Sequence, residues 1–208
     1  MVKIISIEGN IGSGKSTLIN QLKNKFNFNF VIYLPEPVDL WNEIKDSSGV
    51  TILEKYYKDK LRYSFSFQMM AYITRLSQIK NCIENSPDET IIITERCLYT
   101  DRYVFAKMLY DTGFIEEIEY TIYIRWFDEF KKYTEITNII YIQTTPQVCV
   151  ERIHKRNRKG EENIPLDYLE SCHQYHEDWL INNPIKLLVN GNQDNLDINP
   201  IIEFVKIC

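Results

Sequence analysis

Apolar residues along this chain form short runs that alternate with longer amphipathic segments. Runs rich in β-branched residues predict strands at positions 2–7, 30–34, 91–94, 139–143 and 187–189. Helical periodicity predicts helices at about 52–84, with a break near 57–60, and at 98–110, 116–132, 146–156, 165–181 and 200–207. Such alternation is typical of a parallel sheet covered by helices on both faces. The pattern therefore predicts an α/β fold with a five-stranded parallel sheet.

The chain is expected to form a single domain, residues 1–208, because it contains no repeat and no linker long enough to divide it. At one helix boundary, the Thr145-Pro146 pair predicts a capping hydroxyl followed by a proline in the first turn.

The composition is that of an ordinary globular protein, with 44% hydrophobic and 25% charged residues. The net charge of −5 gives no sign of a nucleic-acid or membrane partner, so any phosphate site must be a local basic cluster. Scattered cysteines, five in all, argue against a disulfide framework and for a reducing compartment. No apolar run approaches the length of a membrane span, and a strand that begins at residue 2 leaves no room for a leader peptide. We therefore expect a cytoplasmic protein.

The most informative motif lies directly after the first predicted strand. Its residues are Gly9, Asn10, Ile11, Gly12, Ser13, Gly14, Lys15, Ser16 and Thr17, which satisfy the phosphate-loop pattern G-x-x-x-x-G-K-[ST]. In such a loop the backbone N–H groups cradle the phosphates, and the helix that follows adds the positive end of its dipole. Lys15 is expected to reach the β- and γ-phosphates, and Ser16 to bind Mg²⁺. The motif predicts a nucleoside-triphosphate site.

Charged residues end four of the predicted strands. The phosphate loop follows the first strand, Glu36 the second, and Glu95 and Arg96 the third, while an arginine-rich helix follows the fourth. Because the carboxyl ends of parallel strands meet at one edge of a sheet, ligands bind at that edge. Solvated loop tips would explain any one of these charges, but their convergence predicts one composite site.

These motifs, in this order, resemble the deoxynucleoside kinases, specifically the deoxycytidine/deoxyguanosine kinase branch. The resemblance rests on residues 7–17, Glu36-Pro37-Val38, Ser66-Phe67-Gln68, Glu95-Arg96-Cys97-Leu98-Tyr99-Thr100-Asp101-Arg102-Tyr103, the arginine-rich helix and Ile164-Pro165-Leu166-Asp167-Tyr168-Leu169-Glu170. Cys97 departs from the family, which usually has serine at that position. The resemblance covers nearly the whole chain and implies a P-loop kinase fold with a short arginine-rich lid at about residues 152–163. It also implies transfer of the γ-phosphate of ATP to the 5′-hydroxyl of a deoxynucleoside in nucleotide salvage.

The resemblance assigns catalytic roles to three charged residues. Glu36 would accept the proton of the 5′-hydroxyl, Arg96 would bridge the 5′-oxygen and the moving phosphoryl group, and Glu95 would hold Mg²⁺ through water. Which carboxylate acts as the base stays open, because a loose transition state demands little early deprotonation. A surface ion pair between Glu95 and Arg96 is the alternative without a function.

Further basic residues are assigned to the phosphates of ATP. Arg152 and Arg156 are one helical turn apart and share a face, and Arg158 follows at the end of the helix. Gln193 and Asp194, after the fifth predicted strand, fall where the family contacts adenine. A solvated basic helix is the alternative when the arginines are considered alone.

The same resemblance places two residues at the sugar. Glu161 in the lid and Tyr57 would hold the 3′-hydroxyl of the deoxynucleoside. The stretches 98–110 and 116–132 are rich in aromatic residues, and the resemblance implies that they help to form a homodimer, although core packing would use the same residues.

The residues that select the base are expected to be three residues of one predicted helix together with Asp101. Gln68, Ala71 and Arg75 share a helix face, and Gln68 offers both a donor and an acceptor. Arg75 and Asp101 resemble the charged pair of the deoxycytidine/deoxyguanosine branch. An ionised carboxylate can only accept hydrogen bonds, so it suits an exocyclic amino group. This predicts that the enzyme prefers deoxycytidine and purine deoxynucleosides to thymidine. The pocket walls are expected from Val38, Trp41, Leu53, Tyr56, Phe67 and Phe105.

Two other functions are compatible with a phosphate loop. A nucleoside monophosphate kinase of the thymidylate type shares the fold and has a motif similar to Asp101-Arg102-Tyr103. A non-catalytic nucleotide-binding switch should show an Asn-Lys-x-Asp motif for guanine, whereas Asn192-Gln193-Asp194-Asn195 lacks the lysine. ATP, Mg²⁺ and a deoxynucleoside are the ligands expected here.

Overall fold

The computed structural model describes residues 2–25, 30–158, 161, 164–193 and 195–207. Its centre is a parallel sheet of five strands in the order β2-β3-β1-β4-β5. The strands are β1 (Lys3–Glu8), β2 (Val31–Leu34), β3 (Ile91–Glu95), β4 (Asn138–Gln143) and β5 (Lys186–Asn190). Each lies where the hydrophobic pattern predicts it, so the α/β fold and the strand count are confirmed.

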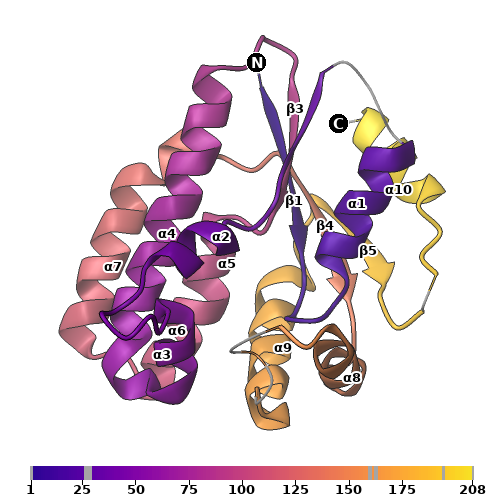
Figure 1. Cartoon of the computed structure of the whole chain (residues 1–208). Helices are drawn as coiled ribbons and strands as arrows, with labels where there is room; N and C mark the ends of the chain where they lie inside the picture. Colours follow the sequence, from indigo (N-terminus) through magenta and orange to yellow (C-terminus); the bar gives the residue numbers. More distant parts are fainter. Residues whose placement is uncertain (1, 26–29, 159–160, 162–163, 194, 208) are drawn as a thin grey trace.

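Helices cover both faces of the sheet (Figure 1). They are α1 (Lys15–Lys25), α2 (Val38–Glu43), α3 (Ile52–Lys58), α4 (Lys60–Glu84), α5 (Leu98–Thr100), α6 (Lys107–Asp111), α7 (Glu117–Phe130), α8 (Pro146–Arg156), α9 (Leu166–Leu180) and α10 (Asn199–Ile207). A π-helical turn, η1 (Asp101–Ala106), joins α5 to α6, and a 3₁₀ turn, η2 (Lys131–Tyr133), follows α7. Figure 1 shows α4 and α7 on one side of the sheet and α1 with α10 on the other.

Successive side chains of the central strands are buried on opposite faces of the sheet. Ile5 of β1 packs in one cluster with Leu18 of α1 and Val205 of α10, whereas Ile4, the residue before it, packs against Ile79 of α4. This period of two is what a strand covered on both faces requires, and it explains why the strand runs are continuously apolar.

The long helical stretch is divided where the sequence predicts a break. Asp59 ends α3, and its side chain accepts a hydrogen bond from the backbone N–H of Arg62, which caps α4. At the other end of α3, Thr51 and Glu54 form a capping box. Local side-chain bonds to the backbone therefore set both boundaries of α3.

Three details differ from the sequence-based expectations. Residues 98–110 do not form one regular helix, because the π-helical turn η1 interrupts it. The short helix α2 follows β2, where no helix was predicted. The predicted capping hydroxyl of Thr145 is wrong: its Oγ1 donates to Oδ1 of Asn192 at 3.1 Å, and that tertiary bond replaces the local cap.

Among the described residues, no helix has the length and apolar character that crossing a bilayer would take. Cys82, Cys97, Cys149 and Cys172 are free thiols, as the scattered spacing predicts.

Candidate active site

Two adjoining pockets lie where the strands end. The first, here called the aromatic pocket, is lined by Ile11, Gly12, Lys15, Glu36, Val38, Trp41, Leu53, Tyr56, Tyr57, Phe67, Gln68, Ala71, Arg75, Glu95, Arg96, Asp101, Phe105, Arg156, Arg158, Glu161 and Tyr168. The second, the loop pocket, is lined by Gly12, Ser13, Gly14, Lys15, Ser16, Thr17, Gln21, Glu95, Arg152, Lys155, Arg156, Arg158, Gly191, Gln193 and Leu196. Gly12, Lys15, Glu95, Arg156 and Arg158 line both pockets, so a group bound in one lies next to a group bound in the other.

The phosphate loop has the backbone conformation that its glycines permit. Gly12 has a φ of +79°, and a Cβ atom there would lie 2.6 Å from the carbonyl oxygen of Cys149 in α8. Both the positive φ and the close approach of α8 demand glycine at this position.

Lys15 is held inside the loop. Its Nζ donates to the carbonyl oxygen of Asn10 at 2.8 Å. Burial lowers the pKa of Lys15 to about 8, and the charge of Arg96 adds to this effect, while Glu95 and Glu36 oppose it. An anionic ligand beside Lys15 would therefore relieve a buried and partly compensated positive charge.

Ser16 and Glu95 line the loop pocket and offer oxygen ligands. The Ser16 hydroxyl donates to both carboxylate oxygens of Glu95, at 3.1 and 3.0 Å. A hydroxyl and a carboxylate beside a phosphate loop match the donor set by which Mg²⁺ is held together with substrate phosphates. These two residues therefore fit a magnesium ion that accompanies a triphosphate.

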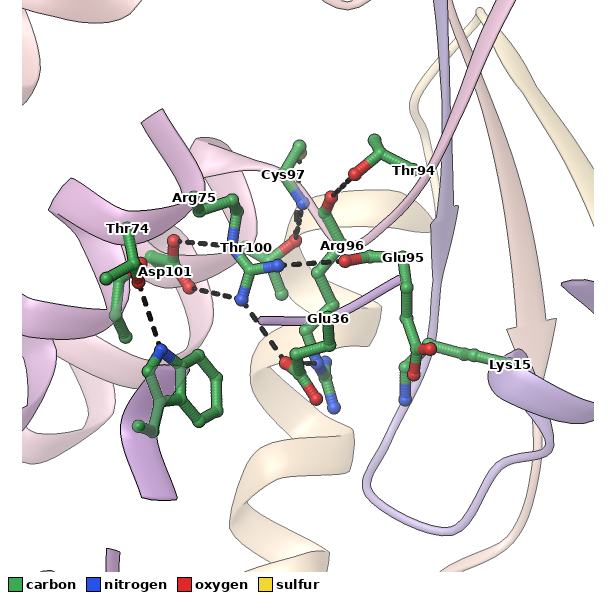
Figure 2. A network of polar contacts seen from close by, with 12 residues as sticks. Lys15, Glu36, Thr74, Arg75, Thr94, Glu95, Arg96, Cys97, Thr100 and Asp101 are labelled. Atoms are coloured by element: carbon green, nitrogen blue, oxygen red, sulfur yellow. Dashed lines mark hydrogen bonds and ion pairs between the residues drawn. The ribbon is translucent and has the colours of Figure 1, made fainter. Parts of the chain in front are cut away.

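A charged network joins Glu36, Arg75, Arg96 and Asp101 (Figure 2). Oε1 of Glu36 lies 3.2 Å from Nη2 of Arg75 and 3.1 Å from Nε of Arg96. Burial by itself would raise the pKa of Glu36, but the charges of Arg96, Arg75 and Lys15 outweigh it and lower the pKa to about 2. Glu36 is thus a carboxylate at neutral pH and a ready hydrogen-bond acceptor.

Arg96 is fixed by its backbone as well as by its side chain. It has a φ of +65°, a conformation that costs a residue other than glycine on the order of 1 kcal/mol. Its N–H donates to the carbonyl of Ile7 at 3.0 Å, its Nη1 donates to the carbonyl of Gly9 at 2.9 Å, and its guanidinium lies 4.9 Å from the ring centre of Phe105. A strained backbone held by this many contacts is typical of a residue that must point at a ligand.

Asp101 and Arg75 form a buried pair in the aromatic pocket. Arg75 donates through Nε to Oδ2 of Asp101 at 2.9 Å and through Nη1 to the carbonyl of Glu95 at 2.8 Å. Burial raises the pKa of Asp101 to about 6, although the positive charge of Arg75 opposes this rise. Near them, Oε1 of Gln68 is buried and accepts no hydrogen bond from the described residues. An unpartnered polar atom in a pocket indicates a place for a polar ligand group.

Aromatic side chains form flat walls on the pocket. The rings of Tyr56 and Phe67 stack with centres 4.5 Å apart, and Trp41 meets Phe67 edge-on at 5.4 Å. Nε1 of Trp41 donates to Oγ1 of Thr74 at 3.0 Å, so the indole orientation is fixed. Tyr168 closes the wall, with its hydroxyl 2.8 Å from that of Tyr56. Flat walls with a few polar groups suit a planar heterocycle.

The predicted lid brings its charges to the border between the pockets. Arg156 and Arg158 both form ion pairs with the carboxylate of Glu161. Arg152 instead donates to the carbonyls of Gly191, at 2.8 Å, and Gln193, at 3.2 Å. The remaining lid positions 159–160 and 162–163 lie outside the described residues.

Most of the site residues proposed from sequence line one pocket or the other. Ile11, assigned to the triphosphate, lies in the aromatic pocket instead. Gly9 and Asn10 line neither pocket, because the carbonyl of Gly9 accepts from Arg96 and the side chain of Asn10 donates to the carbonyl of Leu169 at 2.8 Å. Asp194 lies outside the described residues.

Five residues that line the pockets were not predicted from the sequence. They are Tyr168 in the aromatic pocket and Gln21, Lys155, Gly191 and Leu196 in the loop pocket. Two of them had a sequence signal: Tyr168 belongs to a motif that carries the family resemblance, and Lys155 lies within the predicted lid. The other three reach the pocket through tertiary packing alone.

A parallel sheet with a phosphate loop, a neighbouring pocket for a planar ring and shared basic residues defines a P-loop phosphotransferase whose acceptor carries a planar ring. The family model described as deoxynucleoside kinase matches residues 5–204. The chain therefore belongs to the deoxynucleoside kinase family and is an ATP-dependent deoxynucleoside kinase of nucleotide salvage.

Individual relatives agree with this assignment. The chain is 36% identical to human deoxycytidine kinase, over 97% of this chain and 82% of the relative. It is 38% identical to a probable deoxycytidine kinase of fowlpox virus, over 94% of this chain and 81% of the relative. It is also 37% identical to a mitochondrial deoxyguanosine kinase of Xenopus laevis, over 86% and 73% respectively. The monophosphate-kinase and switch alternatives are not favoured by these relatives.

Proposed function

We propose that this kinase transfers the γ-phosphate of ATP to the 5′-hydroxyl of deoxycytidine and of purine deoxynucleosides, in preference to thymidine. The observation that carries the proposal is the buried pair of Arg75 and Asp101 next to the unpartnered Oε1 of Gln68. A carboxylate has room for more acceptor contacts than Arg75 occupies, so it can take a hydrogen bond from an exocyclic amino group. A thymine carbonyl at that place would face an acceptor, a buried mismatch that costs about 1–3 kcal/mol.

In this proposal the nucleoside base lies between the aromatic walls, and its sugar reaches toward the border of the two pockets. Tyr57 and Glu161 hold the 3′-hydroxyl. Glu36 accepts a hydrogen bond from the 5′-hydroxyl and orients it. Its pKa of about 2 makes it a weak base, which suits a loose transition state in which the proton leaves late.

The phosphates of ATP lie in the loop pocket, on the backbone amides of residues 12–17. Lys15 and Arg96 place positive charge where it develops on the transferring phosphoryl group. Arg156 and Arg158 add charge at the border, and Gln193 lies on the nucleotide side. Ser16 and Glu95 would hold Mg²⁺, which neutralises phosphate charge when it is bound.

The exposed face of α7 supports a homodimer. Ile118, Ile122 and Trp126 are spaced by one helical turn, and 71%, 42% and 44% of their surfaces are exposed. A row of large apolar side chains on one helix face marks a contact surface. We infer that a second copy of this chain covers this face of α7.

We also propose that the chain acts as a single domain and that the enzyme works in the cytoplasm.

A steady-state panel tests the proposal. The protein is supplied with ATP and Mg²⁺ and with deoxycytidine, deoxyadenosine, deoxyguanosine, thymidine or deoxycytidine monophosphate. We expect turnover of the first three, weak turnover of thymidine and none of the monophosphate. Preferential use of thymidine would refute the assignment of Asp101, and phosphorylation of the monophosphate alone would restore the monophosphate-kinase alternative.

A further inference from the structure

Glu8, the last residue of β1, is a carboxylate that no solvent reaches. Its exposed fraction is 0%, and it directly precedes the phosphate loop. The Ser6 hydroxyl donates to its Oε1 at 2.5 Å, and the Thr100 hydroxyl donates to its Oε2 at 2.6 Å. A buried carboxylate is costly unless donors satisfy it, so these hydroxyls are matched to Glu8.

The Thr100 hydroxyl ties Glu8 to the start of the π-helical turn. While Oγ1 of Thr100 donates to Glu8, it also accepts a hydrogen bond from the backbone N–H of Cys97 at 3.2 Å. The residue after Thr100 is Asp101, the carboxylate paired with Arg75. A shift of Thr100 would therefore move Asp101 within the aromatic pocket.

The residues before and after Glu8 accept hydrogen bonds from Arg96, which lies four residues before Thr100. The carbonyls of Ile7 and Gly9 both accept hydrogen bonds from Arg96, one from its backbone and one from its guanidinium. Three successive residues of β1 and the loop thus contact the segment 96–101. Ile7 and Gly9 contribute carbonyls that any residue would offer, whereas Glu8 contributes a side chain.

We propose that Glu8 is a positioning residue, which fastens the segment carrying Arg96 and Asp101 to the strand that leads into the phosphate loop. The inference rests on the proposed function for the roles of Arg96 and Asp101. Through this link the nucleoside site and the triphosphate site keep one fixed spacing, as in-line transfer requires. Glu8 itself touches neither pocket and acts through Thr100.

The test uses Glu8→Gln, which keeps the shape of the side chain, together with Thr100→Val and Thr100→Ser. Serine retains the hydroxyl that donates to Glu8, and valine does not. Thr90→Val is the matched control, because Thr90 is a buried threonine whose hydroxyl donates to the carbonyl of Pro87 at 2.7 Å, before the amino end of β3. Calorimetric binding of deoxycytidine and steady-state kinetics with ATP are measured for each protein.

We expect Glu8→Gln and Thr100→Val each to lower kcat/KM for deoxycytidine by about tenfold, the loss typical of a hydrogen bond to a charged group. The KM for ATP should stay within about twofold of wild type, and Thr100→Ser should recover most of the loss. Because the two residues share one bond, the double variant should be little worse than either single variant. Thr90→Val should lower the melting temperature without these kinetic changes.

Several results would overturn the role of Glu8. They are equal losses in Thr100→Ser and Thr100→Val, multiplying losses in the double variant, or a KM for ATP that rises with that for deoxycytidine. Wild-type protein that binds no deoxycytidine would overturn the proposed function and this role together, whereas wild-type binding with any of those results would overturn the role alone.

Discussion

Arg75 links several of the polar groups around the aromatic pocket. Arg75 contacts Asp101, Glu36 and the carbonyl of Glu95 through different nitrogens of one guanidinium group. The fixed fork of an arginine permits such contacts, whereas a lysine would provide a single point of charge. Arg75 thus links the residue expected at the base to the residue expected at the 5′-hydroxyl.

Replacing Arg75→Met together with Asp101→Ala should raise the ratio of kcat/KM for thymidine to that for deoxycytidine by about tenfold or more. The change removes the acceptor that faces the thymine carbonyl, a mismatch that costs about 1–3 kcal/mol. The matched control is Lys80→Met with Glu84→Ala, a surface pair 2.6 Å apart on α4. An unchanged ratio in the first variant would contradict the role of the Asp101 carboxylate.

The affinity for deoxycytidine should fall as the pH decreases through about 6. Burial raises the pKa of Asp101 to about 6, so the protonated, neutral form accumulates below that pH and can no longer accept freely from the amino group. Calorimetric titration between about pH 7 and pH 5.5 checks this, and Asp101→Asn, which does not ionise, should bind with a flat profile. The same pH dependence in both proteins would assign the titration to another group.

At the scale of elements, the site depends on close packing of the phosphate loop against α8. The carbonyl of Cys149 in α8 lies where a side chain of Gly12 would stand. On the other side of the site, the π-helical turn η1 carries both Asp101 and Phe105 into the aromatic pocket. A π turn is wider than an α-helical turn and often occurs at functional sites, which fits this position.

Gly12→Ala should weaken the site far more than an equivalent change elsewhere. Alanine at Gly12 meets the Cys149 carbonyl at 2.6 Å in addition to the strain of a φ of +79°. Overpacking and strain together should cost about 2–4 kcal/mol and raise the KM for ATP more than tenfold. In Gly113→Ala, φ is +77° and no atom lies within 4 Å, so only the strain remains. Equal changes in melting temperature and KM for the two variants would show that the contact with α8 is unimportant.

At the scale of the whole molecule, the exposed row on α7 and the pockets lie on different surfaces. Residues 125–126 and 128–130 of α7 border a shallow groove of their own, separate from both pockets. The dimer proposed here would therefore cover α7 and leave the site of each copy open to its ligands.

Ile122→Asp combined with Trp126→Glu should convert a dimer into monomers. Two carboxylates in an apolar contact lose hydration and repel their symmetry mates. Light scattering after gel filtration should show twice the mass of the 24.8 kDa chain for wild type and a single mass for the variant. Ile207→Asp, on the α10 side of the sheet (Figure 1) and 83% exposed, is the control that should remain a dimer. A wild-type protein with the mass of one chain would refute the dimer.

The local sequence pattern was enough to predict the strands, most of the helices and the phosphate loop. Strand periodicity, helix caps and a glycine-rich turn are properties of neighbouring residues. The resemblance to a family added Glu36, Arg75, Arg96 and Asp101, and the structure brings them into one network. Their strand-end positions also predicted that Glu36, Glu95 and Arg96 would meet at one edge.

Tertiary structure alone decided the features that depend on distant segments. The Thr145 hydroxyl bonds Asn192 instead of capping its own helix, and Ile11 turns into the aromatic pocket. Gln21 and Leu196 reach the loop pocket from α1 and from the segment before α10, a proximity that no local pattern encodes. The buried bond between Glu8 and Thr100 joins residues 92 positions apart. Such contacts arise from how the elements pack, and packing is a property of the whole chain.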